Sequence, residues 1–296
     1  MPGSFLHLRA AGVSLVIEVW ERLDALPVIR HFGKDLGADA DWSAIAAAAP
    51  PVRWAARLDD PRRVTVLPLQ GDGTFAPPAL APADGSRPAL MLREVEREAN
   101  AITLKLEGPE ANVDVVFALD SETGVLSVLT RADADTPLAS LAAATLLLPA
   151  RFAEADIFGG DWANEFRETR ADLAHGELNL IARRGRGGHD GFPGALIGTR
   201  NFGDDTGEIV AATFGWSGDF DLRLARMREG HLVLQANVPL DAPAKTVETP
   251  PLYLSWSDEG ANGAAARLHD FLHTRLLPKP APTKPRPVHN NTWEAV

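Results

Sequence analysis

The sequence predicts a mainly β protein, built as a large antiparallel sandwich with one amphipathic helix close to its C-terminal end. Strand-like stretches recur roughly every ten residues with Gly, Pro, Asp and Asn between them, which is the spacing typical of sandwiches and barrels. The amphipathic helices that would separate the strands of a parallel sheet are missing. With 296 residues, 45% of them hydrophobic, the chain can also bury a large core.

The individual strands are predicted from alternating apolar and polar side chains. In AITLKLE, Ile102, Leu104 and Leu106 share one face, and NVDVVFALD alternates in the same way. Ser-Glu-Thr-Gly at 121–124 predicts a hairpin turn before a strand at 125–130. Further strands are expected at residues 14–20, 63–67, 209–214, 220–224, 232–238 and 252–256.

Two stretches predict helices. The alanine-rich segment at 42–49 ends before Pro50, as a short helix would. In GANGAAARLHDFLHTRLLP, apolar residues recur at helical spacing until Pro278, so this helix is expected to pack on a sheet or on a neighbouring domain. The residues of that face are Leu268, Phe271, Leu272 and Leu276. PKPAPTKPRP then has the composition of an extended, semi-rigid linker.

Composition excludes several classes of partner. The chain has 40 acidic and 29 basic residues, a formal charge of −11, so it repels phosphate backbones and lacks the clustered Lys and Arg that an anionic membrane attracts. We therefore expect no nucleic-acid or membrane partner, whereas neutral sugars are compatible. There is no cysteine, which removes disulfides, thiolate nucleophiles and Cys-ligated zinc. The short apolar run 13–17 is followed at once by Glu18, unlike a signal peptide, and we expect a cytoplasmic protein.

The densest polar stretch is RRGRGGHDGFP at 183–193. Its arginines and glycines could hold an anion or a sugar, or they could form a well-tied connection between strands in which the glycines serve turns. A metal site at His189 and Asp190 is not expected, because adjacent residues of an extended chain point to opposite faces. The carboxylate pairs Asp59–Asp60 and Asp204–Asp205 are not expected to be catalytic, since neighbours in a loop cannot lie across a scissile bond.

Two aromatic stretches have open roles. In GDWANEFRETR, Trp162 and Phe166 are expected in the core, with Arg170 on the surface. In QGDGTFAPPAL, the loop from Asp72 to Phe75 carries an aromatic residue between glycines and prolines. Such a residue either contacts a ligand or partner, or anchors its own loop in the core.

Several segments, read in order, carry a resemblance to a known family. They are DIFGGDWANEFRETRADLAHGELNL, RRGRGGHDGFPGALI, TGEIVAATFGWSGDFDLRL and ETPPLYLSWSDEGANGAAARLHDFLHTRLLPKP. From about Ala155 onward the chain resembles the family 36 glycoside hydrolases, the bacterial α-galactosidases, and VIRHFGKDLG near the N-terminus also looks like that family. The final RPVHNNTWEAV is similar to the stretch that opens the first strand of the family's catalytic (β/α)8 barrel.

The resemblance implies an N-terminal β-supersandwich at 1–277, a linker at 278–288 and the start of the first barrel strand at 289–296. The family hydrolyses terminal α-galactosides by a retaining mechanism without cofactor or metal, using two aspartates of the barrel. Both would lie beyond Val296, so no catalytic residue is expected in this chain. Its implied role is to support the barrel in cis, to help assemble a homotetramer and to shape the rim of the site.

The resemblance also implies roles for individual residues. Asp72, Thr74 and Phe75 match a loop that, in tetrameric members, reaches the active site of a neighbouring subunit. Members often have an acid where Thr74 stands, and Thr-Ser where Gly187 and Gly188 stand. The residues expected to make structural or barrel contacts are Trp162, Arg184, Arg186, His189 and Trp293.

Two other functions are open from the sequence. A free-standing carbohydrate-binding module could stack a galactose ring on its loop aromatics. A galactose mutarotase-like enzyme would need a base at the anomeric hydroxyl and an acid at the ring oxygen. The residues of suitable type are His189, His231, Glu208 and Glu248.

Overall fold

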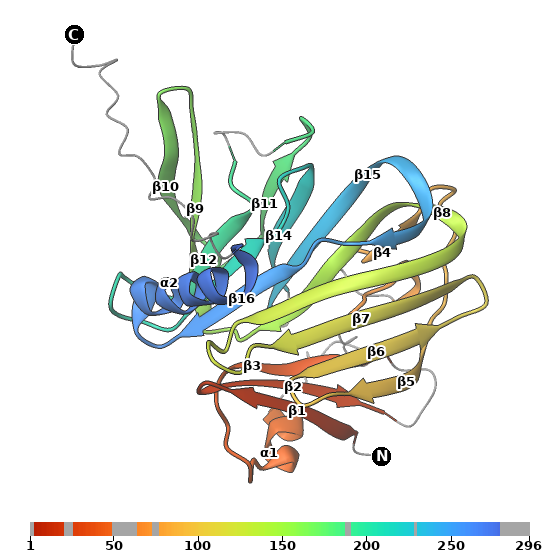
Figure 1. The fold of residues 1–296 in the computed structure, drawn as a ribbon, viewed down its shortest axis with the longest axis horizontal. Coiled ribbons are helices and arrows are strands. Elements are labelled where there is room, and N and C mark those ends of the chain that lie inside the picture. The colour runs from red at the N-terminus through yellow and green to blue at the C-terminus, as the bar shows by residue number, and fades with distance from the viewer. Residues whose placement is uncertain are drawn as a thin grey trace, which may run out of the picture.

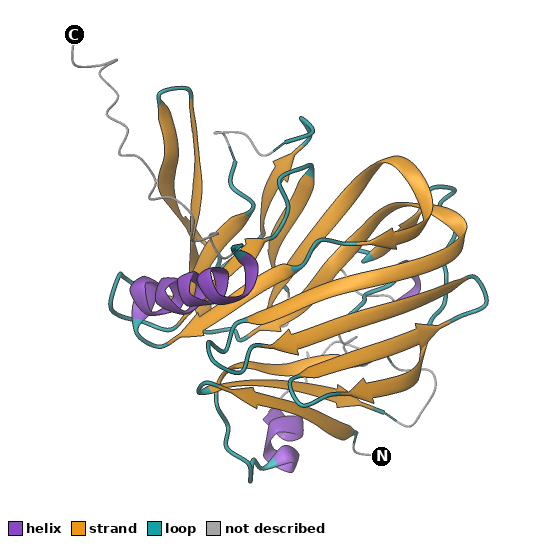
Figure 2. Cartoon of the chain, in the orientation of Figure 1, coloured by secondary structure: helices purple, strands orange, loops and turns teal. Residues whose placement is uncertain are grey.

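A computed structural model describes residues 3–20, 26–48, 64–72, 77–186, 191–227 and 230–278. Within these residues the chain forms two antiparallel sheets and two α-helices (Figures 1 and 2), so the predicted mainly β, antiparallel fold is confirmed. The smaller sheet contains β1 (Ser4–Ala10), β2 (Val13–Val19) and β3 (Val28–Lys34), in that order.

The larger sheet has thirteen strands in the part of the chain that the structure describes. They are β4 (Leu80–Pro82), β5 (Met91–Arg97), β6 (Ala101–Glu107), β7 (Ala111–Leu119), β8 (Leu126–Leu148), β9 (Phe152–Asp161), β10 (Asn164–Asp172), β11 (Glu177–Ala182), β12 (Gly194–Thr199), β13 (Ile209–Phe214), β14 (Phe220–Arg226), β15 (Leu232–Glu248) and β16 (Leu252–Ser257). The main order is β10-β9-β12-β13-β16-β8-β15-β14-β11, and β7, β6 and β5 extend the sheet from β8.

The 23-residue strand β8 joins the parts of the large sheet. Its first residues pair with β7 on one edge and with β16 on the other, and its later residues pair with β15 and β4. The alternation seen in the sequence matches the burial: Ile102, Leu104 and Leu106 of β6 are all buried, as predicted.

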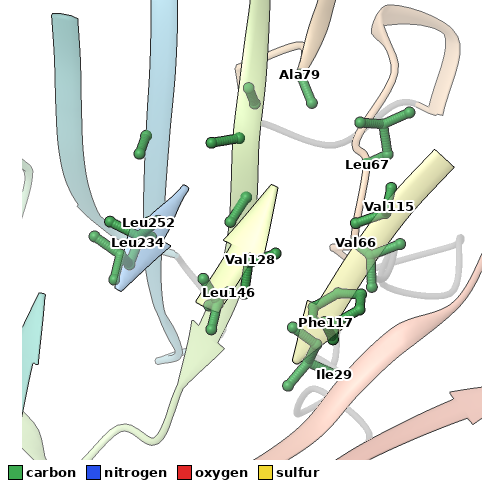
Figure 3. Packing of buried hydrophobic residues seen from close by; sticks show 14 of the residues in the cluster. Ile29, Val66, Leu67, Ala79, Val115, Phe117, Val128, Leu146, Leu234 and Leu252 are labelled. Atoms are coloured by element: carbon green, nitrogen blue, oxygen red, sulfur yellow. The ribbon is translucent and has the colours of Figure 1, made fainter. Parts of the chain in front are cut away.

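The larger of the two hydrophobic clusters among the described residues contains side chains of both sheets. Figure 3 shows Phe117 of β7 beside Ile29 of β3, with Val128 of β8 and Leu234 of β15 farther along the same core. Because apolar residues of both sheets belong to this cluster, the two sheets form one packing unit. The smaller cluster of Phe202, Ile209, Ala211 and Ala264 joins α2 to β13 and to the loop before it.

The strand predicted at 63–67 is wrong for the described residues 64–67. Val64, Val66 and Leu67 are buried, but they form no strand. The backbone N–H of Val66 bonds to the carbonyl of Pro27, and Pro68 follows at once. Proline has no N–H to donate to a neighbouring strand. The apolar residues of this segment are therefore buried in the core without pairing in a sheet. Arg63 lies outside the described residues.

Both predicted helices are present. The short α1 (Trp42–Ala48) begins after Asp41, whose carboxylate accepts the backbone N–H of Ala44 at 3.0 Å. The longer α2 (Gly260–Phe271) is continued by a π-helical turn, η2 (Leu272–Leu276). The helix ends where predicted, because Leu277 takes an extended conformation before Pro278.

Helix α2 packs on β16 and β13, as the prediction of a sheet-packing helix requires. Phe271 is buried, and Arg267 donates to the carbonyls of Ala11 and Thr123 at 2.8 and 2.9 Å. Leu276 is exposed, so the apolar face that was predicted to run from Leu268 to Leu276 is covered only as far as the turn before Leu276. The linker and barrel-strand predictions at 278–288 and 289–296 lie outside the described residues, apart from Pro278.

Candidate functional site

The hairpin of β9 and β10 projects from one end of the large sheet (Figure 1). Strand β12 pairs with β9 only between Phe152 and Ile157. Residues 158–168, which we call the hairpin arm, therefore extend beyond the strand ladder of the sheet. A two-stranded hairpin is only marginally stable in water by itself, so other contacts must hold the arm.

Aromatic rings provide part of that support. Phe158 stacks on Phe166 with ring centroids 4.7 Å apart, and both rings meet Phe192 edge-on at 6.2 and 5.4 Å. Phe166 is nevertheless 60% exposed, and Trp162 at the tip is 83% exposed. The prediction that Trp162 and Phe166 belong to the core is wrong, because the hairpin arm lies past the layer that could cover them.

An ion-pair cluster fixes the base of the arm. The guanidinium of Arg170 donates to both carboxylate oxygens of Asp156 at 2.6 Å and to the carbonyl of Phe202 at 2.8 Å. It also lies 3.9 Å from the centre of the Phe202 ring. Burial and the nearby charge of Asp156 raise the pKa of Glu168 on the same strand. Arg170 lies on the surface as expected, with its side chain 37% exposed, and it also ties β10 to β9 and to the loop that precedes β13.

Two connections lie beside the arm at the same end of the sheet. Arg183 pairs with both carboxylate oxygens of Asp221 at 2.6 and 2.7 Å, and the N–H of Gly185 donates to Asp219 at 2.7 Å. This geometry fits the interpretation of residues 183–186 as a tied connection between strands. Arg184 and Arg186 are exposed, whereas His189 lies outside the described residues.

Four large exposed apolar residues gather at this end of the sheet, and we call them the aromatic rim: Trp162, Phe166, Ile181 and Trp216. Strand pairing places them together, because β9 ends, β12 begins, β13 ends and β14 begins at this end. Trp216 is 42% exposed in the turn between β13 and β14, where its indole N–H donates to the carbonyl of Asp219 at 3.0 Å. Trp216 and Ile181 were not predicted as site residues from the sequence. The glycines of GWSG around the tryptophan were the available sign of an exposed turn.

Helix α2 is linked to this end of the sheet through Phe271. Phe271 contacts Tyr253 with ring centroids 5.4 Å apart. Tyr253 pairs with Thr213 of β13, and its ring borders Gly215, next to Trp216. Leu276 and Leu277 follow and are exposed. Arg275 in the last described turn pairs with Asp120 and Glu122 of the β7–β8 turn, so it is Phe271 that links the helix, through Tyr253, to the strand end beside Trp216.

The loop predicted to reach a neighbouring subunit is described only at its start. Asp72 ends a single 3-10 turn, η1 (Gln70–Asp72), and its carboxylate accepts the N–H of Leu69 at 2.8 Å. Thr74, Phe75 and Trp293 lie outside the described residues.

The residues suited to a mutarotase are not assembled within the described part of the chain. Glu208 accepts bonds from Arg151 and from the indole of Trp256 at 2.9 Å. Burial alone would raise the pKa of Glu208, but these two donors lower it overall. Glu248 instead pairs with Arg131 on β8. Glu208 and Glu248 are thus paired with two different arginines, Arg151 and Arg131. His189 lies outside the described residues.

Residues 204–205 have a structural role, Asp204 through its backbone carbonyl and Asp205 through its carboxylate. Asn262, near the start of α2, donates its backbone N–H to the carbonyl of Asp204 at 2.8 Å and its side-chain amide to Asp205 at 3.0 Å. Asp59 and Asp60 lie outside the described residues. Among the residues that the structure does describe, no group of three His, Asp or Glu could hold a metal ion.

A groove of about 490 Å³ lies between the turns of β5–β6 and β7–β8 and the end of α2. Its lining includes Asn100, Asp120, Phe271 and Arg275. Asp120 is already bonded to Arg275 at 2.7 Å, and Phe271 is buried. Phe271 therefore offers little surface to a ligand in this groove, and the charge of Asp120 is already balanced by Arg275.

In the part of the chain covered by the structure, neither helix is long and apolar enough to cross a membrane.

Comparison with known proteins identifies the family. The profile of the glycosyl hydrolase family 36 N-terminal domain matches residues 25–244. An α-galactosidase from Escherichia coli is 32% identical over 256 residues, which is 81% of this chain but 36% of that protein. Crystal structures of the α-galactosidases AgaA and AgaB from Geobacillus stearothermophilus are similar in fold, with TM-scores of 0.78 and 0.80 and identities of 20% and 19%.

The fold matches cover 92% of this chain and 43% of AgaA, and 100% of this chain and 46% of AgaB. The chain thus spans less than half the length of the relatives that it matches. Sequence and fold agree on the part that is shared, and the chain belongs to the glycosyl hydrolase family 36 N-terminal domain family.

Proposed function

We propose that this chain is the N-terminal supporting domain of an α-galactosidase-type retaining hydrolase, whose catalytic (β/α)8 barrel follows in the longer protein. The observation that carries the proposal is the match to a family of N-terminal domains over residues 25–244, within relatives that are more than twice as long. Several of these relatives are α-galactosidases, so terminal α-galactosides are the proposed substrates of the whole protein.

The described carboxylates support the proposal that catalysis takes place in the barrel and not in this domain. A retaining glycosidase needs two carboxyl groups about 5–5.5 Å apart that are free to face the sugar. The buried carboxylates described here are bound to arginines instead: Glu18 pairs with Arg30, and Asp156 with Arg170. Those acids serve the fold, and the chemistry is proposed to take place in the barrel, without metal or cofactor.

The proposal gives the predicted site residues two tasks. The loop of Asp72, Thr74 and Phe75 would border the active site of a neighbouring subunit in a homotetramer. A second group would face the barrel or brace the domain against it: Trp162, Arg184, Arg186, His189 and Trp293. The absence of cysteine from the sequence fits a reducing compartment, and the proposed location is the cytoplasm.

Hydrolysis of p-nitrophenyl α-galactoside by the purified 296-residue chain tests the proposal. We expect no turnover above buffer, even at high protein concentration. Turnover that persists in chain purified from a host lacking α-galactosidase would contradict it, because the catalytic groups would then lie in this chain.

A second candidate function rests on one observation. Trp162 is 83% exposed at the tip of the hairpin arm, and an exposed indole can stack on the apolar face of a sugar ring. This would make the chain a carbohydrate-binding module. Titration calorimetry with galactose, melibiose and raffinose separates the two functions: heat that saturates and is lost in Trp162→Ala supports the module, and no heat at millimolar sugar removes it.

A further inference from the structure

We infer that the groove beside the end of α2 binds a neutral pyranose sugar. The β5–β6 turn, the β7–β8 turn and the last turns of α2 and η2 enclose this groove. Its volume of about 490 Å³ falls within the range of small-molecule sites. The inference goes beyond the proposed function, because the site lies in this domain and needs no residue of the barrel.

The floor of the groove comes from one row of the large sheet. Ala101 of β6 lies opposite Ala118 of β7, and Ala118 lies opposite Ser127 of β8. These three residues are half-buried on the outer face of the sheet, since the neighbouring Ile102 belongs to the core. The next row on the same face carries larger side chains, which are Thr103, Val116 and Leu129. The sheet is therefore hollowed at the first row, where the floor is low and mostly apolar.

Two fixed walls stand beside this floor. On one side, Arg275 donates to Asp120 at 2.7 Å and pairs with Glu122 at 3.1 Å, which ties η2 to the β7–β8 turn. On the other side, the backbone N–H of Leu119 donates to the carbonyl of Asn100 at 2.8 Å and joins the end of β7 to the β5–β6 turn. Because these bonds form the groove in advance, little conformational entropy is lost when a ligand binds.

The rim of the groove supplies polar groups that a ligand can reach. Glu98, Asn100 and Ser121 are exposed and line the groove. Within the part of the chain that the structure describes, their side chains make no hydrogen bond or ion pair with other residues. Together they offer a carboxylate, an amide and a hydroxyl, which can accept bonds from sugar hydroxyls and donate bonds to them.

The chemistry of floor and rim favours a neutral sugar over other polar ligands. A pyranose ring has an apolar face of C–H groups and an edge of hydroxyls, and these match the alanine floor and the polar rim. Of the two carboxylates in the described lining, Asp120 already accepts bonds from Arg275 and from its own turn. Glu98 alone is too little negative charge to select a cation, and the net charge of −11 disfavours phosphorylated ligands. Because Phe271 is buried, aromatic stacking adds little, and we expect a dissociation constant on the order of millimolar.

Amide NMR tests the inference on the 296-residue chain. Galactose and glucose are titrated in turn to tens of millimolar while ¹H–¹⁵N spectra are recorded. At least one of them should give saturable shifts that are confined to the amides of residues 98–101 and 118–122. Ala118→Leu fills the floor and leaves the rim in place, so it should weaken binding by about tenfold. Asn100→Ala should weaken binding by about threefold to tenfold, the usual contribution of one hydrogen bond.

Each variant has a matched control on β7. Val116→Leu lies on the same face outside the groove, and Asn112→Ala lies at the other end of the strand. Both controls should bind the sugar as the wild type does. Thermal unfolding of all four variants should match that of the wild type, so that a weaker affinity reports the groove and not the fold.

Three results would overturn the inference. One is the absence of shifts with either sugar at tens of millimolar. Another is equal affinity of Ala118→Leu and Val116→Leu. The third is a set of shifts confined to the hairpin arm and lost in Trp162→Ala, which would place sugar binding on the arm instead of the groove. None of these results affects the supporting role, which the hydrolysis assay tests separately.

Discussion

The guanidinium of Arg170 meets the carboxylate of Asp156 in a two-pronged pair, with both N–O distances at 2.6 Å. Asp156 is 2% exposed, whereas the Arg170 side chain is 37% exposed. The arginine thus covers a carboxylate that would otherwise be buried without a counter-charge. The pair lies where the projecting hairpin leaves the sheet, so it couples the stability of the fold to the position of Trp162.

Removing this arginine should destabilise the protein. Breaking a fully buried ion pair from one side costs about 3–5 kcal/mol. Because Arg170 is partly solvated, we expect Arg170→Ala to lower the free energy of unfolding by about 2–3 kcal/mol. Urea denaturation measures the change. Arg167→Ala on the same strand is the control, since Arg167 is exposed and should cost less than about 0.5 kcal/mol. Equal effects of the two substitutions would contradict the role of the Arg170–Asp156 pair.

Gly160 should be required for the hairpin arm. Its φ of +146° disfavours other residues, and a Cβ there would lie 2.1 Å from the carbonyl oxygen of Asn164. We predict that Gly160→Ala opens the arm while most of the core remains folded. Hydrogen exchange should show faster exchange of amides at 164–168 and little change in β6 and β7. Unchanged protection of the arm would show that the backbone at Gly160 can relax.

Acid should weaken the contact between the two sheets through His31. Burial lowers the pKa of His31, and the nearby charge of Arg151 lowers it further, against opposing effects of the Lys34 carbonyl, Glu208 and Asp35. The unfolded chain binds the proton more readily than the folded one. The stabilisation is therefore full above the unfolded pKa of about 6.5 and is lost as the pH falls from there towards the folded pKa.

Urea denaturation at pH 7.5 and pH 5.5 measures this loss. Wild type should lose more stability between the two values than His31→Gln, which cannot titrate. His7, whose pKa is also lowered by burial, keeps a smaller dependence in that variant. Glu168, with its raised pKa, acts in the opposite sense and is the same in both proteins. An equal pH dependence of wild type and His31→Gln would show that His31 does not contribute.

Truncating the centre of the core should have a larger effect than any surface change. Phe117 of β7 is buried beside Ile29 of the smaller sheet (Figure 3). Phe117→Ala leaves a cavity between the two sheets and should cost about 3–5 kcal/mol. Met91→Ala, at an exposed position on β5, should change the unfolding free energy by less than about 0.5 kcal/mol. A small effect at Phe117 would mean that the two sheets do not share one core.

Local pattern was sufficient for most of the strands and for both helices. Alternation placed Ile102, Leu104 and Leu106 in the core, and Pro278 marked the end of the long helix. These features depend on neighbours in the sequence, so the sequence alone predicts them. The failure at 64–67 has the same origin, because apolar composition predicts burial but does not specify a hydrogen-bonding partner for the backbone.

The candidate site could not be predicted in the same way. Trp162 and Phe166 have the composition of core residues, and only the pairing of β9 with β12 shows that their hairpin extends past the sheet. Arg170 and Asp156 are fourteen positions apart, and they meet because antiparallel register places them opposite each other. The aromatic rim is a product of strand order, since its four residues come from three separate parts of the chain: the β9–β10 hairpin, β11 and the β13–β14 turn.

The central claim is that this domain supports catalysis performed elsewhere in the protein. The most direct measurement uses a chimera in which residues 1–277 replace the corresponding N-terminal region of the Escherichia coli α-galactosidase. Its hydrolysis of p-nitrophenyl α-galactoside is compared with hydrolysis by the C-terminal remainder of that enzyme, which lacks any N-terminal domain. We expect turnover by the chimera well above that of the remainder, and none by the 296-residue chain alone. Equal turnover by the chimera and the remainder would contradict it, because the domain would then contribute nothing to the activity.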